Sequence, residues 1–152
     1  MKKIVVGCDN AAVELKNTLV EHMREKGICV EDMGCESSDD PTYYPYIAQK
    51  VCNKIIESNY EKNGLLICGT GIGMAMTANK FKGIRAAVCH DIFSAERAKL
   101  SNDANIICMG ERVIGKELAK KLLDEWLKLE FKDGSSTPKV NAIREIEIEN
   151  MR

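Results

Sequence analysis

A cysteine followed by three glycines at alternate positions is the stretch of this chain best suited to carry chemistry. Residues 64–74 read Gly-Leu-Leu-Ile-Cys-Gly-Thr-Gly-Ile-Gly-Met, so a short apolar run ends at Cys68. The apolar run predicts a buried strand, and the glycines leave backbone N–H groups unshielded beside the thiol. A helix predicted at residues 74–81 would direct its positive N-terminal end at the same place. These features predict a site for proton transfer or covalent catalysis.

The elements that must position this cysteine alternate between strands and helices. Apolar segments rich in branched residues predict five strands, at residues 3–7, 28–33, 65–68, 85–89 and 105–109. Helical periodicity predicts six helices, at residues 11–26, 46–58, 74–81, 93–100, 116–129 and 139–150. The alternation predicts an α/β fold, a doubly wound, Rossmann-like, five-stranded parallel sheet in the order 2-1-3-4-5.

The length of the chain fits one domain. We expect residues 1–152 to form it, with an α/β core at 1–130 and a linker with a C-terminal helix at 131–152. The last helix carries one apolar stripe and no strand follows it. We therefore expect this helix to dock on a partner subunit.

The composition argues against several classes of partner. Twenty-two basic and 23 acidic residues give a net charge of −1, so we expect binding to neither nucleic acid nor an anionic membrane. No apolar run is long enough for a membrane span and no signal peptide precedes the first strand, so we expect a cytoplasmic protein. Seven cysteines without a Cys-x-x-Cys pair predict neither a disulfide framework nor a zinc site.

The predicted ligand site lies at the carboxyl ends of the strands. Open parallel sheets bind ligands there, at the point where the strand order reverses, which in this order is between the first and third strands. Asp9 would then face Cys68 across the crevice. The cysteine loop is not a tyrosine-phosphatase loop, because Met74 stands where that loop needs an arginine. It is a poor dinucleotide fingerprint, because it follows the third strand instead of the first.

Several motifs together resemble the ribose 5-phosphate isomerase B family, which includes galactose 6-phosphate isomerase subunits. The motifs are Val-Val-Gly-Cys-Asp at 5–9, Tyr-Pro-Tyr at 44–46, Ile-Cys-Gly-Thr-Gly-Ile-Gly-Met at 67–74, Gly-Ile-Arg-Ala-Ala-Val-Cys-His-Asp at 83–91, Asn-Asp-Ala-Asn at 102–105 and Gly-Glu-Arg-Val-Ile-Gly at 110–115. The resemblance implies an aldose–ketose isomerase of phosphorylated sugars that needs no metal and no cofactor. It also implies a homo-oligomer, a dimer or a tetramer, whose active sites are shared between subunits.

The resemblance also implies roles for individual residues. Cys68 resembles the base that removes a carbon-bound proton, and Thr70 the group that holds the enediolate oxygens. Asp9 resembles the group that orients the sugar hydroxyls and helps to open the ring. The other residues expected to contact the substrate are Asn10, Gly69, Gly71, Ile72, Gly73, Asn102 from a second subunit, and Arg112 and Lys139 at the phosphate.

The chain departs from the family pattern at the positions that open the ring and hold the phosphate. Asn10 and Ser101 stand where the family usually has histidines, and Ser135 and Lys139 where it usually has arginines. Serine is a weaker proton donor than histidine near neutral pH, and lysine offers a point charge in place of a planar fork. We expect Ser101 to relay a proton through water or from Asp9.

These departures leave the sugar open. The expected reaction converts ribose 5-phosphate to ribulose 5-phosphate through an enediolate, with Cys68 as the base. The alternatives are the isomerisation of a hexose 6-phosphate, allose or galactose, and a non-catalytic sugar-phosphate-binding subunit that needs a paralogous partner. We expect Arg85 to form a structural ion pair and His90 to be structural.

Overall fold

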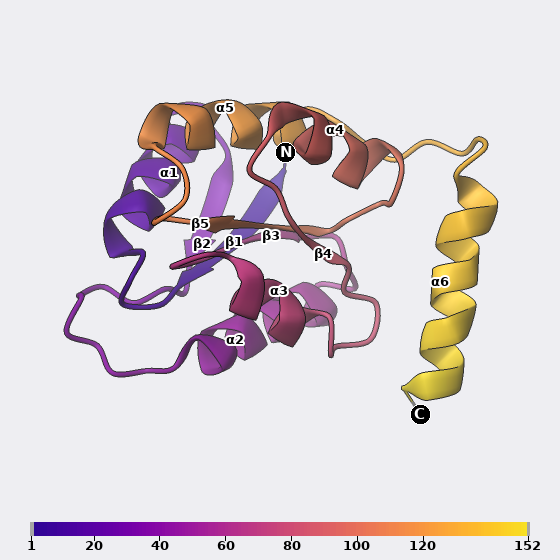
Figure 1. Ribbon diagram of the computed structural model, residues 1–152, viewed down its shortest axis with the longest axis horizontal. Coiled ribbons are helices and arrows are strands. Elements are labelled where there is room, and N and C mark those ends of the chain that lie inside the picture. The colour runs from indigo at the N-terminus through magenta and orange to yellow at the C-terminus, as the bar shows by residue number, and fades with distance from the viewer. Residues whose placement is uncertain (1, 152) are drawn as a thin grey trace.

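The computed structural model describes residues 2–151 as an α/β fold around one parallel sheet (Figure 1). The strands are β1 (Lys3–Cys8), β2 (Cys29–Asp32), β3 (Asn63–Cys68), β4 (Ala86–Val88) and β5 (Ile106–Gly110). The helices are α1 (Val13–Glu25), α2 (Tyr44–Glu57), α3 (Ile72–Ala78), α4 (Ile92–Leu100), α5 (Lys116–Leu127) and α6 (Thr137–Asn150).

The helices form a layer on each side of the sheet. Helices α1, α4 and α5 cover one face and α2 and α3 cover the other, while α6 stands apart at the end of an extended linker (Figure 1). Strands with both faces covered read as continuous apolar runs, and in β3 every residue after Asn63 is buried. The expected doubly wound, five-stranded parallel fold is confirmed.

The order of the strands differs from the expected order in its last two members. The sheet runs β2-β1-β3-β5-β4, so β5 lies beside β3, with Gly64 paired with Ile106, and β4 forms the edge. All five residues of β5 are buried, whereas the three residues of β4 are only half-buried. Burying an apolar strand stabilises the fold most at an inner position of the sheet, where neighbours cover it on both sides. This explains why β5 lies inside the sheet and β4 at its edge. The reversal of order between β1 and β3 is unaffected.

Three helices begin two residues earlier than expected. Pro45 and Pro138 lie in the first turns of α2 and α6, where the missing N–H of proline costs no hydrogen bond. Helix α3 begins directly after Gly71, which serves as its N-cap with φ +81°. The early start of α3 brings its first turn next to the end of β3. Of the described helices, none has the length and hydropathy required to cross a membrane.

Candidate active site

Cys68 lies at the carboxyl end of β3 and accepts a hydrogen bond from the loop that follows it. The side chain is 5% exposed, and the backbone N–H of Gly71 donates to its Sγ over 3.1 Å. Helix α3 begins at the next residue, so its free N-terminal N–H groups are gathered beside the sulfur. Backbone N–H donors at the end of β3 therefore face this sulfur.

The loop can take this path only with glycine at position 71. Its φ of +81° is in the left-handed region, which side chains disfavour. A Cβ atom at this position would also lie 3.0–3.1 Å from the backbone of Met109 in β5. Glycine 71 thus allows the loop to pack closely on the neighbouring strand while its N–H faces Cys68.

Asp9 follows β1 and reaches the same edge of the sheet as Cys68. Its N–H donates to the carbonyl of Ile67 over 3.3 Å, and its Oδ1 accepts the N–H of Ala11 at 3.1 Å. The carboxyl group is therefore oriented by the backbone at the start of the connection to α1. The pairing of β1 with β3 places Asp9 and Cys68 at the ends of neighbouring strands.

Arg112 reaches the site from the end of β5. Gly110 pairs with Cys68, and the N–H of Arg112 donates to the carbonyl of Gly69 over 3.1 Å. Its Nη1 lies 3.3 Å from the position that a Cβ atom on Gly69 would take. Within residues 2–151, the exposed guanidinium forms no hydrogen bond or ion pair, so it is free to hold an anion one residue from the sulfur.

A hollow of about 260 Å³ adjoins Asp9. It is lined by Asp9 and Asn10 and by residues 41–45, and the amide of Asn10 donates to the carbonyl of Asp40 over 2.9 Å. Asn10 therefore anchors the loop that forms the far wall. The Tyr44 ring packs on Gly73, where any Cβ atom would overlap it. The sequence reasoning gave Tyr44 no role, although its Tyr-Pro-Tyr motif contributed to the resemblance.

The geometry agrees with what the chain matches among known proteins. Residues 4–143 match the Ribose/Galactose Isomerase family. The chain belongs to this family. It is 50% identical to a ribose-5-P isomerase B of Listeria innocua, over 97% of this chain and 99% of that protein. It is 46% identical to a D-erythrulose-4-phosphate isomerase of Pectobacterium atrosepticum, over 94% and 93%.

Solved structures support the same assignment. The ribose-5-phosphate isomerase B of Clostridium thermocellum has a TM-score of 0.91 and 38% identity, and the match covers 97% of this chain and 98% of that one. This chain is therefore an enzyme, a sugar-phosphate isomerase of the aldose–ketose class. The comparisons include relatives named for two different sugars, so the family alone does not identify the substrate.

Three residues expected in the isomerase site lie elsewhere in this subunit. Ser101 ends α4, where its Oγ accepts from Arg97 Nε at 2.8 Å, and Asn102 lines a separate hollow of about 500 Å³ beside α6. Both precede β5, whereas Arg112 follows it, so they belong to the opposite edge of the sheet. Lys139 is exposed in the first turn of α6. Their participation at Cys68 stays a prediction that requires a second subunit.

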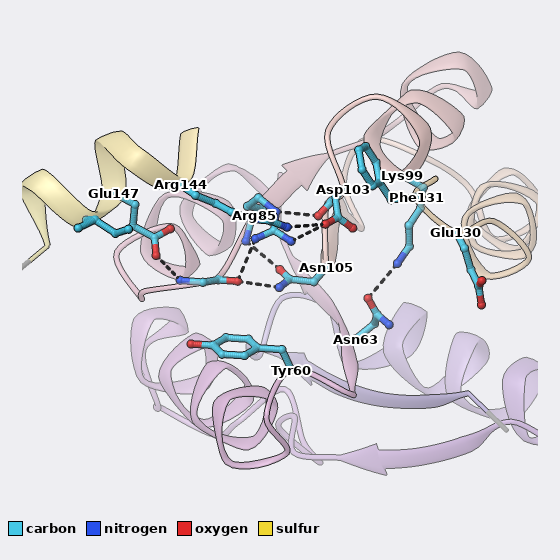
Figure 2. Close-up of a pocket in the computed structure, with 12 residues that line it drawn as sticks. Tyr60, Asn63, Arg85, Lys99, Asp103, Asn105, Glu130, Phe131, Arg144 and Glu147 are labelled. Atoms are coloured by element: carbon cyan, nitrogen blue, oxygen red, sulfur yellow. Dashed lines mark hydrogen bonds and ion pairs between the residues drawn. The ribbon is translucent and has the colours of Figure 1, made fainter. Parts of the chain in front are cut away.

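A hollow of about 730 Å³ lies where α6 meets the body of the isomerase (Figure 2). Cys68 is not among the residues that line it. Asp103 Oδ2 accepts from Arg85 at 3.0 Å and from Arg144 of α6 at 3.2 Å. Glu147 Oε1 accepts the N–H of Gly83 at 2.6 Å. These contacts join α6 to the loops at the amino ends of β4 and β5, and they confirm the structural ion pair expected of Arg85.

The remaining titratable groups near the sheet are structural. His90 Nε2 accepts the N–H of Gly110 at 2.8 Å, and burial lowers the pKa of this imidazole, which keeps it neutral. Burial raises the pKa of Cys8 and Cys52 to about 12 and of Cys89 to about 11. Among the seven cysteines, and counting donors within residues 2–151, only Cys68 accepts a backbone N–H at its sulfur. In residues 2–151 no cluster of His, Cys, Asp and Glu could hold a metal ion.

Proposed function

We propose that this isomerase moves a carbonyl between C1 and C2 of a phosphorylated sugar with Cys68 as its base. The observation that carries the proposal is the hydrogen bond from Gly71 N–H to Cys68 Sγ at 3.1 Å. A cysteine in an apolar core needs no such donor, whereas a proton acceptor gains from one because it is nucleophilic and basic only as the thiolate.

In the proposed reaction the Cys68 thiolate takes the proton from C2 of the aldose. The electrons of that C–H bond form the C1–C2 double bond of an enediolate, and O1 takes up a proton. The Cys68 thiol then returns its proton to C1, and O2 loses its proton to become the ketose carbonyl. The proposal assigns to Asp9 the transfer of the proton between O1 and O2. No redox partner is required, because the sugar is both oxidised at C2 and reduced at C1.

The enediolate oxygens need hydrogen-bond donors in the proposed reaction. Thr70 Oγ1 accepts from Ile72 N–H at 3.3 Å, which leaves its own hydroxyl proton free to donate. The N–H of Gly73 belongs to the first turn of α3, where a helix provides no carbonyl partner. Removing one such donor from an oxyanion site typically costs about 10²–10³-fold in kcat.

The phosphate is assigned to Arg112, and the active unit to a homo-oligomer. Arg112 has a free guanidinium beside Gly69, and planar guanidinium groups bind phosphate oxygens in pairs. Ser101 and Asn102 contribute to the site only if a second copy brings them there. The exposed isoleucines of α6, at positions 143, 146 and 148, support such an assembly.

The names of the relatives support two candidate substrates. Ribose 5-phosphate, the expected substrate, is supported by the Listeria innocua protein, and a tetrose phosphate by the Pectobacterium atrosepticum protein. The proposal covers both, because the chemistry at C1 and C2 is the same. No contact in the site favours a hexose 6-phosphate, and the base at Cys68 argues against a subunit that only binds.

Replacing the sulfur tests the proposal. A Cys68→Ala variant should lose at least about 10²-fold in kcat on both sugar phosphates and should no longer exchange the C1 and C2 hydrogens with heavy water. Its substrate affinity and thermal midpoint should change little. Cys29→Ala is the matched control, since Cys29 is exposed on the edge strand β2. If Cys68→Ala keeps more than a few per cent of activity, Cys68 is not the base.

A further inference from the structure

A cyclic sugar phosphate must be opened before its C2 proton becomes acidic, and this step needs a proton donor at the ring oxygen. Imidazole suits the step because it titrates near neutral pH. The chain has two histidines, and both lie in the described residues. The surroundings of both imidazoles in this chain are therefore known.

In both histidines the Nε2 atom already has a partner within the chain. His22 Nε2 lies 2.8 Å from Asp124 Oδ1, between α1 and α5. His90 Nε2 accepts the Gly110 N–H at 2.8 Å, so protonating it would break a bond that holds the end of β5. A second copy of the chain brings only the same two histidines. No assembly of this protein therefore supplies an imidazole acid through a free Nε2.

The other candidate donors of a proton to the ring oxygen are Ser101 and Asp9. The first is a weak acid, and the proposed reaction already uses the second. The Ser101 hydroxyl accepts from Arg97 Nε at 2.8 Å, and an aliphatic hydroxyl does not give up a proton readily near neutral pH. Asp9 Oδ1 accepts the Ala11 N–H, and the proposed reaction already uses this carboxyl group to move a proton between O1 and O2.

The side chain of Arg112 lies against the loop that follows Cys68. Arg112 Nη1 is 3.3 Å from the position of a Cβ atom on Gly69, the residue next to Cys68. Lys139, the other cation expected at the phosphate, is exposed on α6. Of the two expected phosphate cations, Arg112 is therefore the one that lies on the loop after Cys68.

We propose that the site is built for a sugar phosphate that arrives open, a tetrose 4-phosphate, which it interconverts as erythrose 4-phosphate and erythrulose 4-phosphate. Closing a five-membered ring on an aldose needs the oxygen of C4. In a tetrose 4-phosphate that oxygen carries the phosphate, so the sugar is always open. It is the longest aldose with a terminal phosphate that cannot close such a ring. This inference rests on the proposed function and narrows its substrate.

The test compares three sugar phosphates on the unmodified protein across a series of enzyme concentrations. Erythrose 4-phosphate is open and has four carbons, ribose 5-phosphate is cyclic, and ribulose 5-phosphate is open with five carbons, because its ring-closing oxygen is phosphorylated. The tetrose rate should rise in proportion to enzyme. The rate with ribose 5-phosphate should level off at the spontaneous rate of ring opening. At low enzyme, kcat/KM should favour the tetrose by about 10²-fold, the lower end of what a general acid contributes.

The other outcomes of this test separate a failure of the inference from a failure of the proposed function. If the ribose 5-phosphate rate rises in proportion to enzyme with a kcat/KM equal to that of the tetrose, the enzyme opens the ring and the inference is wrong, while the proposed function stands. Fast turnover of ribulose 5-phosphate without turnover of the tetrose also overturns the inference. If none of the three sugars reacts and none exchanges hydrogen with heavy water, the proposed function itself fails.

Discussion

The N–H of Gly71 points at the sulfur of Cys68 across 3.1 Å, and a Cβ atom on the same glycine would lie 3.0–3.1 Å from the Met109 backbone. One residue therefore donates a hydrogen bond to the proposed base and lets the loop after β3 pack against β5. The hydrogen bond needs a backbone conformation with φ +81°, and the close packing leaves no room for a side chain. Gly71 therefore links the stability of the fold to the proposed catalysis by Cys68.

The first prediction follows from this coupling. Gly71→Ala places a Cβ atom in a left-handed conformation and against the Met109 backbone, so the free energy of unfolding should fall by about 2 kcal/mol. Urea unfolding measures the loss. Gly134→Ala is the control, because a Cβ atom there meets nothing within 4 Å, and it should change stability by less than about 0.5 kcal/mol. Equal effects of the two variants would contradict the structural role of Gly71.

Arg112 should act mainly on the binding of the phosphate. Arg112→Gln removes charge-assisted hydrogen bonds, and we expect KM to rise by about 10–10²-fold with a smaller change in kcat. Inorganic phosphate should also lose most of its ability to inhibit. The control is Arg24→Gln on α1, which removes the same charge away from the site. A fall in kcat at unchanged KM would show that Arg112 does not hold the phosphate.

The apolar residues of α6 should determine the oligomeric state. Ile146 is 60% exposed on this helix, so Ile146→Glu should convert an oligomer to a folded monomer in analytical ultracentrifugation. Activity should be lost with the oligomer if a second copy supplies Asn102. Leu118→Glu on α5 introduces the same charge at another exposed apolar residue and should leave the oligomer intact. A wild-type protein that sediments as an active monomer would refute the shared site.

Lys99 makes a pH-dependent contribution to stability. It is 8% exposed, donates to Asn63 Oδ1 at 2.9 Å and lies 4.1 Å from the centre of the Trp126 ring. Burial lowers the pKa of Lys99 to about 8, from an ordinary value of 10.5. Below pH 8 both folded and unfolded chains carry the proton. Between about pH 8 and 10.5 the unfolded chain binds more protons, so this group makes the fold more stable as pH rises.

The measurement is the free energy of unfolding in urea at pH 7 and pH 10. Lys99→Met should remove a rise of up to about 3 kcal/mol between the two values, relative to wild type. Lys80→Met deletes the same charge at an exposed position and serves as the control. If Lys99→Met and Lys80→Met have the same pH dependence as wild type, Lys99 is not titrating in this range.

The amino-acid sequence by itself determined the local features of this protein. Hydrophobic periodicity identified the five strands and six helices, because whether a segment forms a strand or a helix follows from which face it can bury. The glycines after Cys68 and the family motifs marked the position of the site. The pairing of β1 with β3 then predicted that Asp9 lies beside Cys68, since parallel strands end at one edge.

Only the tertiary structure decided which distant segments meet. It placed β5 inside the sheet and β4 at the edge, because the choice depends on the burial available on both faces, and periodicity does not encode this. It brought Arg112 over Gly69 and the Tyr44 ring onto Gly73, and it separated Ser101 and Asn102 from the sulfur of their own subunit. Such contacts join residues far apart in the chain, so they depend on how the elements pack and not on local preference.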